Sequence, residues 1–409
     1  MKKILKRIGL TFLVLLIGFV LIKWKTIKLS YHYLQMLKPE NRLEYFQDGQ
    51  KYFQTRIIAK SSKPEKFVMS DSIIKLPVTF KSIDSVISTE MYLKDMRYEG
   101  LMVLKNGKVV YENYWNGFTN DETHMVASIT KSIISITVGI AINEGLIESK
   151  DDLIVKYLPQ FKNTWYKDVT IDECLDMVSG VDWRNDIPMM KEFMWKWGWN
   201  LTTAEEFLLQ SESWHKPGGK MVYNSMDPLI IGLVLKSVIG ERTISEYIQE
   251  KLWEPLDTED NAYFTYLIED DIETTWAGIY TTTRDLAKIG QLYLQKGNWN
   301  GKQIVSKDWV NQTFNAHRET TMPIVDHSKK WFYDTYGWGY NNFWWIPDDT
   351  NGNEIMAWGL GGQTIYINRK NNVVVVSFRA NPLNLKNQSL NFLNRSMVDF
   401  MQAIGNSVE

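Results

Sequence analysis

Hydrophobic residues follow two different spacings along this 409-residue chain, and each spacing predicts a different kind of element. Residues 101–105 and 108–115 are rich in β-formers and flank Asn106-Gly107, the dipeptide typical of a two-residue hairpin turn. Residues 363–368 and 373–379 predict two further strands near the C-terminus. Predicted strands therefore lie towards both ends of the chain.

Helical spacing dominates the middle of the chain, from about residue 150 to 315. An apolar helix is predicted from 128 to 145, with Gly145 as its natural stop. Thr203-Ala-Glu-Glu206 has the pattern of a capping box that opens a helix. The remaining predicted helices cover residues 31–53, 82–92, 227–240, 283–294 and 387–404. Strands near both ends and helices between them predict an α+β fold whose antiparallel sheet is built from distant parts of the chain.

The first 30 residues have a composition of their own. Four basic residues precede an apolar run at 8–22, and three lysines with Trp24 follow it within 23–28. The run is shorter than the roughly 20 residues of a typical spanning helix and has the length of a signal-peptide core. No pair of small residues suited to cleavage follows it. Residues 1–28 are therefore predicted to be an uncleaved transmembrane signal anchor, extended at the interface by lysines and a tryptophan.

The charges around this run predict its orientation. The N-terminal basic cluster, together with the chain's amine, is the heavier of the two, which favours a single-pass topology with the main body in the periplasm or at the cell surface. Residues 29–78, polar and rich in proline and serine around 61–66, are interpreted as a connecting segment, and residues 79–409 as the catalytic body. A cleaved signal peptide is the alternative for the first segment.

Composition excludes several classes of function. A net charge of −2 offers no basic field to recruit nucleic acid. The single cysteine, Cys174, excludes an internal disulfide and a cysteine-based metal cage, and it is predicted to be buried. The five histidines have no metal-ligand spacing, so neither a metal nor an organic cofactor is predicted. The sequence also lacks Gly-x-Ser-x-Gly, His-Glu-x-x-His and phosphate-binding-loop motifs.

A Ser-x-x-Lys pattern occurs twice, at Ser128-Ile-Thr-Lys131 and at Ser213-Trp-His-Lys216. The second copy runs into Pro217-Gly-Gly, which prevents a helix from carrying Lys216 one turn beyond the serine. The first copy opens an apolar helix, where residues i and i+3 share one face. Only the first pair is therefore predicted to meet.

That geometry has a chemical use. A serine hydroxyl is a poor nucleophile until a nearby base takes its proton, and a lysine amine is such a base only where burial or a neighbouring cation lowers its pKa. A serine at a helix N-terminus also places its own backbone N–H where an oxyanion would form. The alternative is that Lys131 is a solvated lysine and Ser128 merely caps the helix. His124, four residues before the serine, is a weaker candidate for a direct role.

The residues around Ser128 resemble the nucleophile motif of the β-lactamase-related serine hydrolases. This superfamily includes class C β-lactamases, D-Ala-D-Ala carboxypeptidases, family VIII esterases and 6-aminohexanoate-oligomer hydrolases. Further stretches resemble its later segments in the same order: 145–159, 169–181, 217–225, 276–287 and 301–305. The resemblance covers roughly residues 80 to 405. It implies a β-lactamase/transpeptidase-like fold, with an antiparallel sheet flanked by helices and a mostly helical second lobe. The membrane helix predicted from the first 28 residues precedes this body.

The resemblance also implies roles for individual residues. Tyr223 matches the tyrosine of the family's Tyr-x-Asn motif, which relays protons between nucleophile, lysine and leaving group. The third position of that motif is Ser225 here, a form similar to the 6-aminohexanoate-oligomer hydrolase branch. Ser225 is therefore expected beside the substrate.

The family's third motif, Lys-Thr-Gly or His-x-Gly on a strand, matches residues 356–363 with one departure. When Gly359 is aligned with the motif glycine, Ala357 stands where the family has its cation. The backbone N–H of Leu360 then becomes the second oxyanion donor beside that of Ser128. Because the missing cation would pair with a substrate carboxylate, an ester or amide without that carboxylate is favoured. The alignment also places Trp358, Gly359 and Gly361 against the substrate.

The sequence thus predicts a membrane-tethered serine hydrolase that cleaves an ester or amide of a small or peptide-like molecule through an acyl-enzyme on Ser128, with Lys131 and Tyr223 handling protons. The alternatives are a D-Ala-D-Ala-type peptidase or β-lactamase, transfer of the acyl group to an amine, and a non-catalytic cell-wall-binding or sensor domain. Tryptophans are expected to wall the site or to serve ordinary packing: Trp195, Trp197, Trp199, Trp338, Trp344, Trp345 and Trp358.

Overall fold

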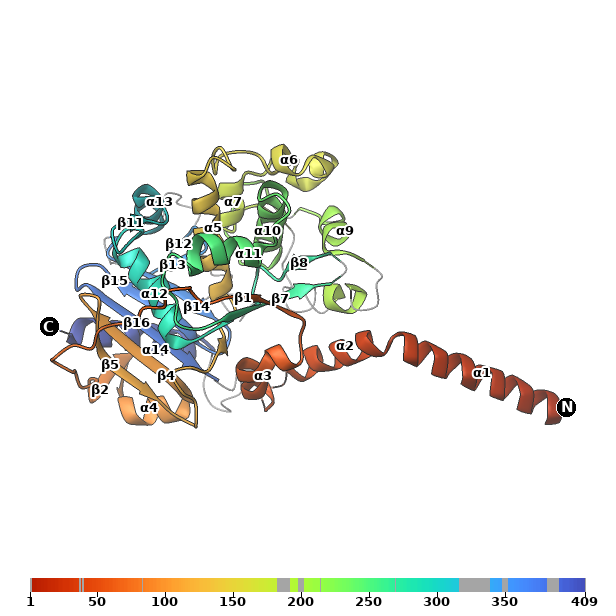
Figure 1. The fold of residues 1–409 in the computed structure, drawn as a ribbon, viewed down its shortest axis with the longest axis horizontal. Helices are drawn as coiled ribbons and strands as arrows, with labels where there is room; N and C mark the ends of the chain where they lie inside the picture. The colour runs from red at the N-terminus through yellow and green to blue at the C-terminus, as the bar shows by residue number, and fades with distance from the viewer. Residues whose placement is uncertain are drawn as a thin grey trace.

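The computed structural model describes residues 2–36, 38, 40–82, 84–181, 192–197, 202–213, 215–268, 270–315, 339–347, 352–380 and 390–408. A large sheet and a helical lobe lie side by side in the body, and the first helix extends away from both (Figure 1).

The large sheet has seven antiparallel strands in the order β12-β13-β14-β15-β16-β4-β5. Their bounds are β12 (Gly339–Asn341), β13 (Trp344–Ile346), β14 (Glu354–Gly359), β15 (Gln363–Asn368), β16 (Val373–Arg379), β4 (Tyr98–Lys105) and β5 (Lys108–Tyr114). Pairing of β16 with β4 joins the C-terminal strands to the predicted hairpin, whose turn residues Asn106 and Gly107 both have positive φ, as that turn type requires. The antiparallel sheet built from distant segments is confirmed.

Helices cover both faces of this sheet. Gly290 of α12 (Thr283–Leu294) lies against Ile365 and Val374 on one face, whereas Gly405 of α14 (Leu390–Ser407) lies against Tyr366 on the other. Neighbouring strand residues point to opposite faces, so β15 contributes to both layers. The missing side chains of the two glycines allow the helices to approach closely.

The helical lobe is built around α5 (Ile129–Asn143), which is buried over nearly its whole length. The other helical elements of the lobe are α6 (Ile154–Tyr157), α7 (Ile171–Leu175), α9 (Ala204–Leu209), α10 (Met226–Val238), α11 (Ile244–Ile248), η2 (Pro159–Asn163), η3 (Trp165–Asp168), the π-helical η4 (Gln249–Trp253) and a helical turn at 192–197. The capping box at Thr203 is present, with both reciprocal hydrogen bonds.

A second antiparallel sheet carries the strand that leads into α5. Its order is β1 (Thr55–Ile58), β7 (Ala262–Leu267), β9 (Ile279–Thr281) and β6 (His124–Met125), with β8 (Ile272–Glu273) paired to β7. The middle of the chain is therefore less helical than its spacing predicts. β1 comes from the segment interpreted as a connector, and it pairs along its whole length with β7.

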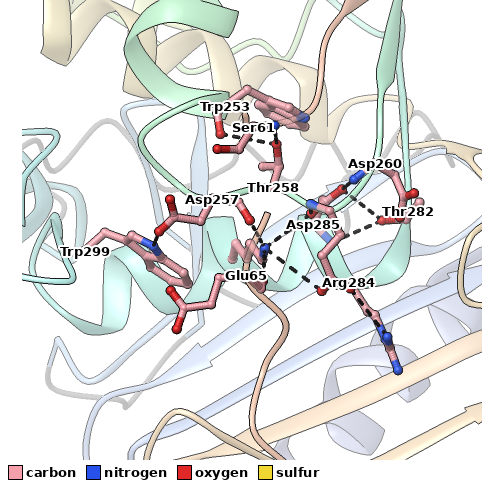
Figure 2. Close-up of polar contacts among 12 residues, drawn as sticks. Ser61, Glu65, Trp253, Asp257, Thr258, Asp260, Thr282, Arg284, Asp285 and Trp299 are labelled. Atoms are coloured by element: carbon pink, nitrogen blue, oxygen red, sulfur yellow. Dashed lines mark hydrogen bonds and ion pairs between the residues drawn. The ribbon is translucent and has the colours of Figure 1, made fainter. Parts of the chain in front are cut away.

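The chain beyond β1 continues along the body, as Figure 2 shows. The backbone N–H groups of Ser61 and Glu65 donate to the carbonyl oxygens of Thr258 and Asp257. Buried Lys288 then donates to the carbonyl oxygens of both Glu65 and Asp257. The division of the chain at residue 78 stays a prediction, but these bonds tie the preceding segment to the body.

Two predicted helices differ from the observed elements. The first half of the helix predicted at 82–92 is instead part of a hairpin between β2 (Thr79–Ser82) and β3 (Ser85–Ser88). The helix α4 (Thr89–Asp95) begins only where the Ser88 side chain accepts a hydrogen bond from Met91 N. The β-branched pair Val86-Ile87 favours the strand. The predicted helix at 31–53 is interrupted as well, and it is divided between α2 (Trp24–Met36) and α3 (Arg42–Asp48), followed by η1 (Gly49–Lys51).

The N-terminal helix α1 (Lys2–Ile22) projects into open space (Figure 1). Taken singly, none of the helices in the described residues is both long and apolar enough to cross a membrane. The segments Lys6–Ile22 and Ile27–Met36 meet those criteria only as a pair bent by 63°. The remaining small elements are β10 (Asn298–Trp299), β11 (Lys302–Gln303) and α13 (Lys307–Thr313).

Candidate active site

Ser128 stands at the junction between β6 and α5. Pairing of β6 with β9 holds the approaching strand, and Val126 N donates to Ile279 O at 2.9 Å. Ala127 then takes a φ of +48°, a conformation that costs energy for a residue with a side chain, and the helix begins at Ile129. Between His124 and Ala141, Ser128 is the only residue that is not buried. The turn therefore presents its hydroxyl at the surface of an otherwise closed core.

Lys131 lies one helical turn beyond and is 1% exposed. Its Nζ is 3.2 Å from Ser128 Oγ and donates to the carbonyl oxygen of Trp276 at 2.7 Å. The same Nζ lies 5.0 Å from the centre of the Tyr223 ring. Lys131 is thus not a solvated lysine. The side chains of Ser128 and Tyr223, which come from distant stretches of the chain, both lie beside its amine.

Tyr223 is positioned by the loop that precedes α10. Gly218 N donates to Val178 O at 2.9 Å and Val222 N donates to Met177 O at 2.8 Å, which anchors that loop on the chain after α7. The Tyr223 ring stacks on Trp345 of β13, with centres 5.5 Å apart and planes at 19°. An aromatic neighbour on one face and a lysine amine near the ring restrict its orientation.

The strand β13 is itself tied to the nucleophile helix. Ser132 Oγ donates to Phe343 O at 2.7 Å, and Phe343 N donates to Leu175 O at 2.9 Å. Phe343 and Asn342 both have positive φ in the turn before β13. The turn that carries Trp345 to Tyr223 is therefore held by α5 on one side and by α7 on the other.

The second Ser-x-x-Lys pair has no such arrangement. Ser213 forms an isolated bridge with Val181, and Lys216 follows in a non-helical loop. The carbonyl oxygen of His215 approaches Gly180 so closely that a Cβ there would lie 2.1 Å from it. This loop supports Tyr223 and does not place Lys216 one helical turn beyond Ser213.

Ser225 is the residue immediately before α10 and is buried. Its neighbour Asn224, which sequence reasoning passed over, caps the helix: its Oδ1 accepts from Met226 N and Asp227 N. Asn224 Nδ2 also donates to Asp227 Oδ2 at 2.9 Å. Burial raises the pKa of Asp227 to about 7, against the opposing effect of this hydrogen bond.

Gly359 brings the end of β14 against the chain that leads to Ser128. A Cβ on Gly359 would lie 2.2 Å from Val126 O and 3.2 Å from the Ala127 Cβ. Leu360 follows and is partly exposed, as is Trp358, whose ring centre lies 6.1 Å from that of Trp345. Among the residues that the structure describes, neither Ser128 N–H nor Leu360 N–H donates a hydrogen bond.

Ala357 is fully buried and pairs with Ile365 in the interior of the sheet. The position where the resemblance would put a cation therefore carries a methyl group directed into packed protein. Gly361 has a φ of +86°, which supports the tight turn between β14 and β15.

The other side chains considered for a chemical role have contacts that suit a structural role. His124 is buried, with Nε2 2.8 Å from Glu99 Oε2, and its ring stacks on Phe378. Cys174 is buried as expected. No group of three metal-ligating side chains occurs in the part of the chain that the structure describes.

The predicted tryptophans divide between site and core. Trp345 stacks on Tyr223 and has Trp358 as its neighbour, whereas Trp344 packs on Tyr293 with ring centres 4.5 Å apart. Trp195 and Trp197 belong to the helical turn at 192–197. Trp199 and Trp338 lie outside the described residues.

Comparisons with known proteins agree with this arrangement. A family model described as Beta-lactamase matches residues 92–391. A 6-aminohexanoate-dimer hydrolase of Paenarthrobacter ureafaciens is 24% identical over 303 residues, which cover 72% of this chain and 75% of that protein.

Solved structures share the fold. One described as a candidate 6-aminohexanoate-dimer hydrolase from Bacillus anthracis has a TM-score of 0.75 at 22% identity, covering 89% of this chain and 93% of its own. EstCE1, described as a hydrolase with promiscuous acyltransferase activity, has a TM-score of 0.58 at 16% identity, covering 76% of this chain and 96% of its own. The predicted β-lactamase/transpeptidase-like body is confirmed by these matches.

Proposed function

Because this chain belongs to the Beta-lactamase family and is a serine hydrolase, we propose that Ser128 is its nucleophile and that Lys131 and Tyr223 move the proton. One observation carries the proposal: Lys131 Nζ lies 3.2 Å from Ser128 Oγ, within reach of a direct proton transfer. Ser128 Oγ attacks the carbonyl carbon of an ester or amide while Lys131, in its neutral form, accepts the hydroxyl proton.

The developing negative charge needs donors that point at it. The N–H groups of Ser128 and Leu360 are the proposed pair, and their lack of partners among the described residues supports this role. Gly359 supports it as well, because only a residue without a side chain allows β14 to approach the carbonyl of Val126.

The leaving group then needs a proton. Tyr223 is proposed to pass one from Lys131 to the departing oxygen or nitrogen, since its ring lies beside the amine. Water subsequently attacks the acyl carbon while Lys131 takes a proton of that water. The bond between Ser128 Oγ and the acyl carbon then breaks, and Lys131 returns the proton to Ser128 Oγ. These steps use only groups of the chain and return each to its starting state.

The surroundings of the site favour a substrate without a carboxylate near the scissile bond. Ala357 offers no charge to pair with one, and the aromatic rings of Trp345 and Trp358 favour an apolar or extended group. Ser225, Trp358, Gly359 and Gly361 are proposed as the substrate-contacting residues. Relatives named 6-aminohexanoate-dimer hydrolase are in keeping with an amide or ester substrate.

The test uses the full-length protein in detergent with p-nitrophenyl butyrate. Ser128→Ala and Lys131→Ala are expected to abolish hydrolysis, and mass spectrometry should find the butyryl adduct on residue 128 of the unaltered protein. Ser135→Ala, which removes a buried hydroxyl two turns along the same helix, serves as the matched control and should hydrolyse normally. Undiminished hydrolysis by Ser128→Ala would refute the assignment.

The same panel separates the alternatives. Labelling by a fluorescent penicillin that disappears in Ser128→Ala would favour a D-Ala-D-Ala-type peptidase or a β-lactamase. Products in which an added amine has replaced water would favour acyl transfer. Absence of both hydrolysis and adduct across esters, amides and D-amino-acid amides would favour a binding or sensor domain.

For the N-terminal segment, we propose membrane attachment with the body outside the cytoplasm. The support is the run of exposed apolar side chains on α1, including Phe12, Leu15 and Leu21, which a surface in water does not favour. The protein should sediment with membranes after an alkaline carbonate wash, and protease added to intact cells should digest the body. Release by carbonate would refute an inserted segment.

A further inference from the structure

A segment ahead of the family domain lies against the proposed oxyanion hole. Phe46 of α3 is 1% exposed and forms a small apolar cluster with Met125 and Tyr280, against which Leu360 packs. Met125 belongs to β6, three residues before Ser128, whereas Leu360 follows the end of β14. The cluster that contains this ring therefore includes a residue of the strand ahead of Ser128 and packs against Leu360.

The contact with the Leu360 turn is close. A Cβ on Gly361 would lie 2.6 Å from Phe46 Cε2, so the ring sits directly on the backbone of this turn. Gly361 and Gly362 both have positive φ, and consecutive glycines leave the turn little intrinsic stiffness. Gln363 Nε2 donates to Leu360 O at 3.2 Å, which restrains the turn from within the sheet. The Phe46 ring is a second restraint on the same turn.

The helix that carries Phe46 is itself firmly attached. Tyr280 OH donates to Tyr45 O at 3.1 Å, and Gln47 Nε2 donates to Glu99 Oε1 at 2.6 Å. Glu99 in turn binds buried His124 of β6, and the His124 ring lies edge-on to Phe46 with centres 5.5 Å apart. On one side of Phe46, α3 is thus connected to β9, which pairs with β6, and on the other side it is connected to β6 through Glu99.

We propose that Phe46 is a positioning residue, which holds the Leu360 N–H at the distance from Ser128 N–H that a developing oxyanion requires. The proposal rests on the function proposed above for these two amides. Donor positions matter at the level of about 0.5 Å in such sites, and removing a buried ring leaves a cavity into which a glycine-rich turn relaxes. The family match begins at residue 92, so the segment that carries Phe46 would complete the site from outside the matched domain.

The experiment compares Phe46→Ala with a matched control in the full-length protein. Phe80→Ala also removes a buried phenylalanine ahead of the matched domain, but Phe80 packs on Tyr92 and Phe400 at the sheet. Both variants should melt at a lower temperature than the unaltered protein. Only Phe46→Ala should lower kcat for p-nitrophenyl butyrate, by about 10- to 100-fold with KM changed less than about threefold. Phe46→Leu, which refills most of the cavity, should recover most of kcat.

A second measurement does not depend on catalysis. Deuterium exchange at the amides of 359–363 and 124–128 should rise at least about 10-fold in Phe46→Ala and stay unchanged there in Phe80→Ala. Equal exchange in both variants, or an unchanged kcat in Phe46→Ala, would overturn the positioning role. If Ser128→Ala hydrolyses normally, the proposed function fails, and the exchange measurement alone then decides whether Phe46 holds the turn.

Discussion

Gly359 and Val126 approach so closely that a Cβ on the glycine would lie 2.2 Å from the carbonyl oxygen of Val126. Gly359 ends β14 of the large sheet, whereas Val126 directly follows β6 of the second sheet, and the two come from opposite ends of the matched domain. Their contact sets how far β14 lies from the strand that leads into Ser128. The separation of the two proposed oxyanion donors therefore depends on the absence of one methyl group.

Gly359→Ala should consequently damage both stability and activity. The obstacle is a backbone oxygen, which cannot rotate away, so the strand itself has to shift. We expect a loss of about 1–3 kcal/mol in unfolding free energy and a kcat at least about 10-fold lower. Gly18→Ala, at a position on α1 with open space around it, should change neither. Normal kcat in Gly359→Ala would show that β14 does not set the donor geometry.

Two buried lysines should respond differently to loss of charge. Lys131→Met is expected to lower hydrolysis by about 10²- to 10⁴-fold, because it removes the proposed base. Lys288→Met leaves the carbonyl oxygens of Glu65 and Asp257 without their donor and should cost about 1–3 kcal/mol of stability while sparing kcat. Ester hydrolysis and thermal melting of both variants provide the comparison. Similar kcat losses in the two would contradict a specific role for Lys131.

The neighbouring tryptophans of β13 provide a second matched pair. Trp345→Leu removes the ring on which Tyr223 stacks and should lower kcat about 10-fold or more through misplacement of the phenol. Trp344→Leu removes packing on Tyr293 and should lower the melting temperature while leaving kcat per folded molecule unchanged. If Trp345→Leu behaves like Trp344→Leu, the stacking does not orient Tyr223 for catalysis.

The buried carboxyl group of Asp227 should make the stability of the protein depend on pH. Burial raises its pKa from 3.8 to about 7, so between these values the folded chain holds a proton that the unfolded chain has released. The free energy of unfolding therefore falls as the pH rises over this interval, by about 1.4 kcal/mol for each unit of pKa difference. Asp227→Asn keeps the shape without the charge.

The asparagine variant should equal the unaltered protein in unfolding free energy near pH 4 and exceed it by a few kcal/mol at pH 8. Urea unfolding at the two pH values measures this difference. A stability gain of the same size at both values would show that ionisation of Asp227 is not its source.

Local sequence patterns were sufficient to predict several secondary-structure elements. The hairpin at Asn106-Gly107 follows from the turn preference of two adjacent residues, and β15 and β16 match the predicted strands residue for residue. The meeting of Ser128 and Lys131 was also predictable, because three residues along a helix return to the same face. The hairpin of β2 and β3 was not, since so short a β-branched stretch carries no clear period.

The amino-acid order alone therefore specifies which segments are helices or strands, and it identifies the serine and lysine that share one turn, because these features depend on neighbours within a few residues. The hydrogen bond from Lys131 Nζ to the carbonyl oxygen of Trp276, 145 residues away, depends instead on tertiary packing. So does the seating of the Phe46 ring on Gly361. The sequence does not indicate which residue a backbone carbonyl or a glycine will contact. Such partners are brought together only when the chain folds.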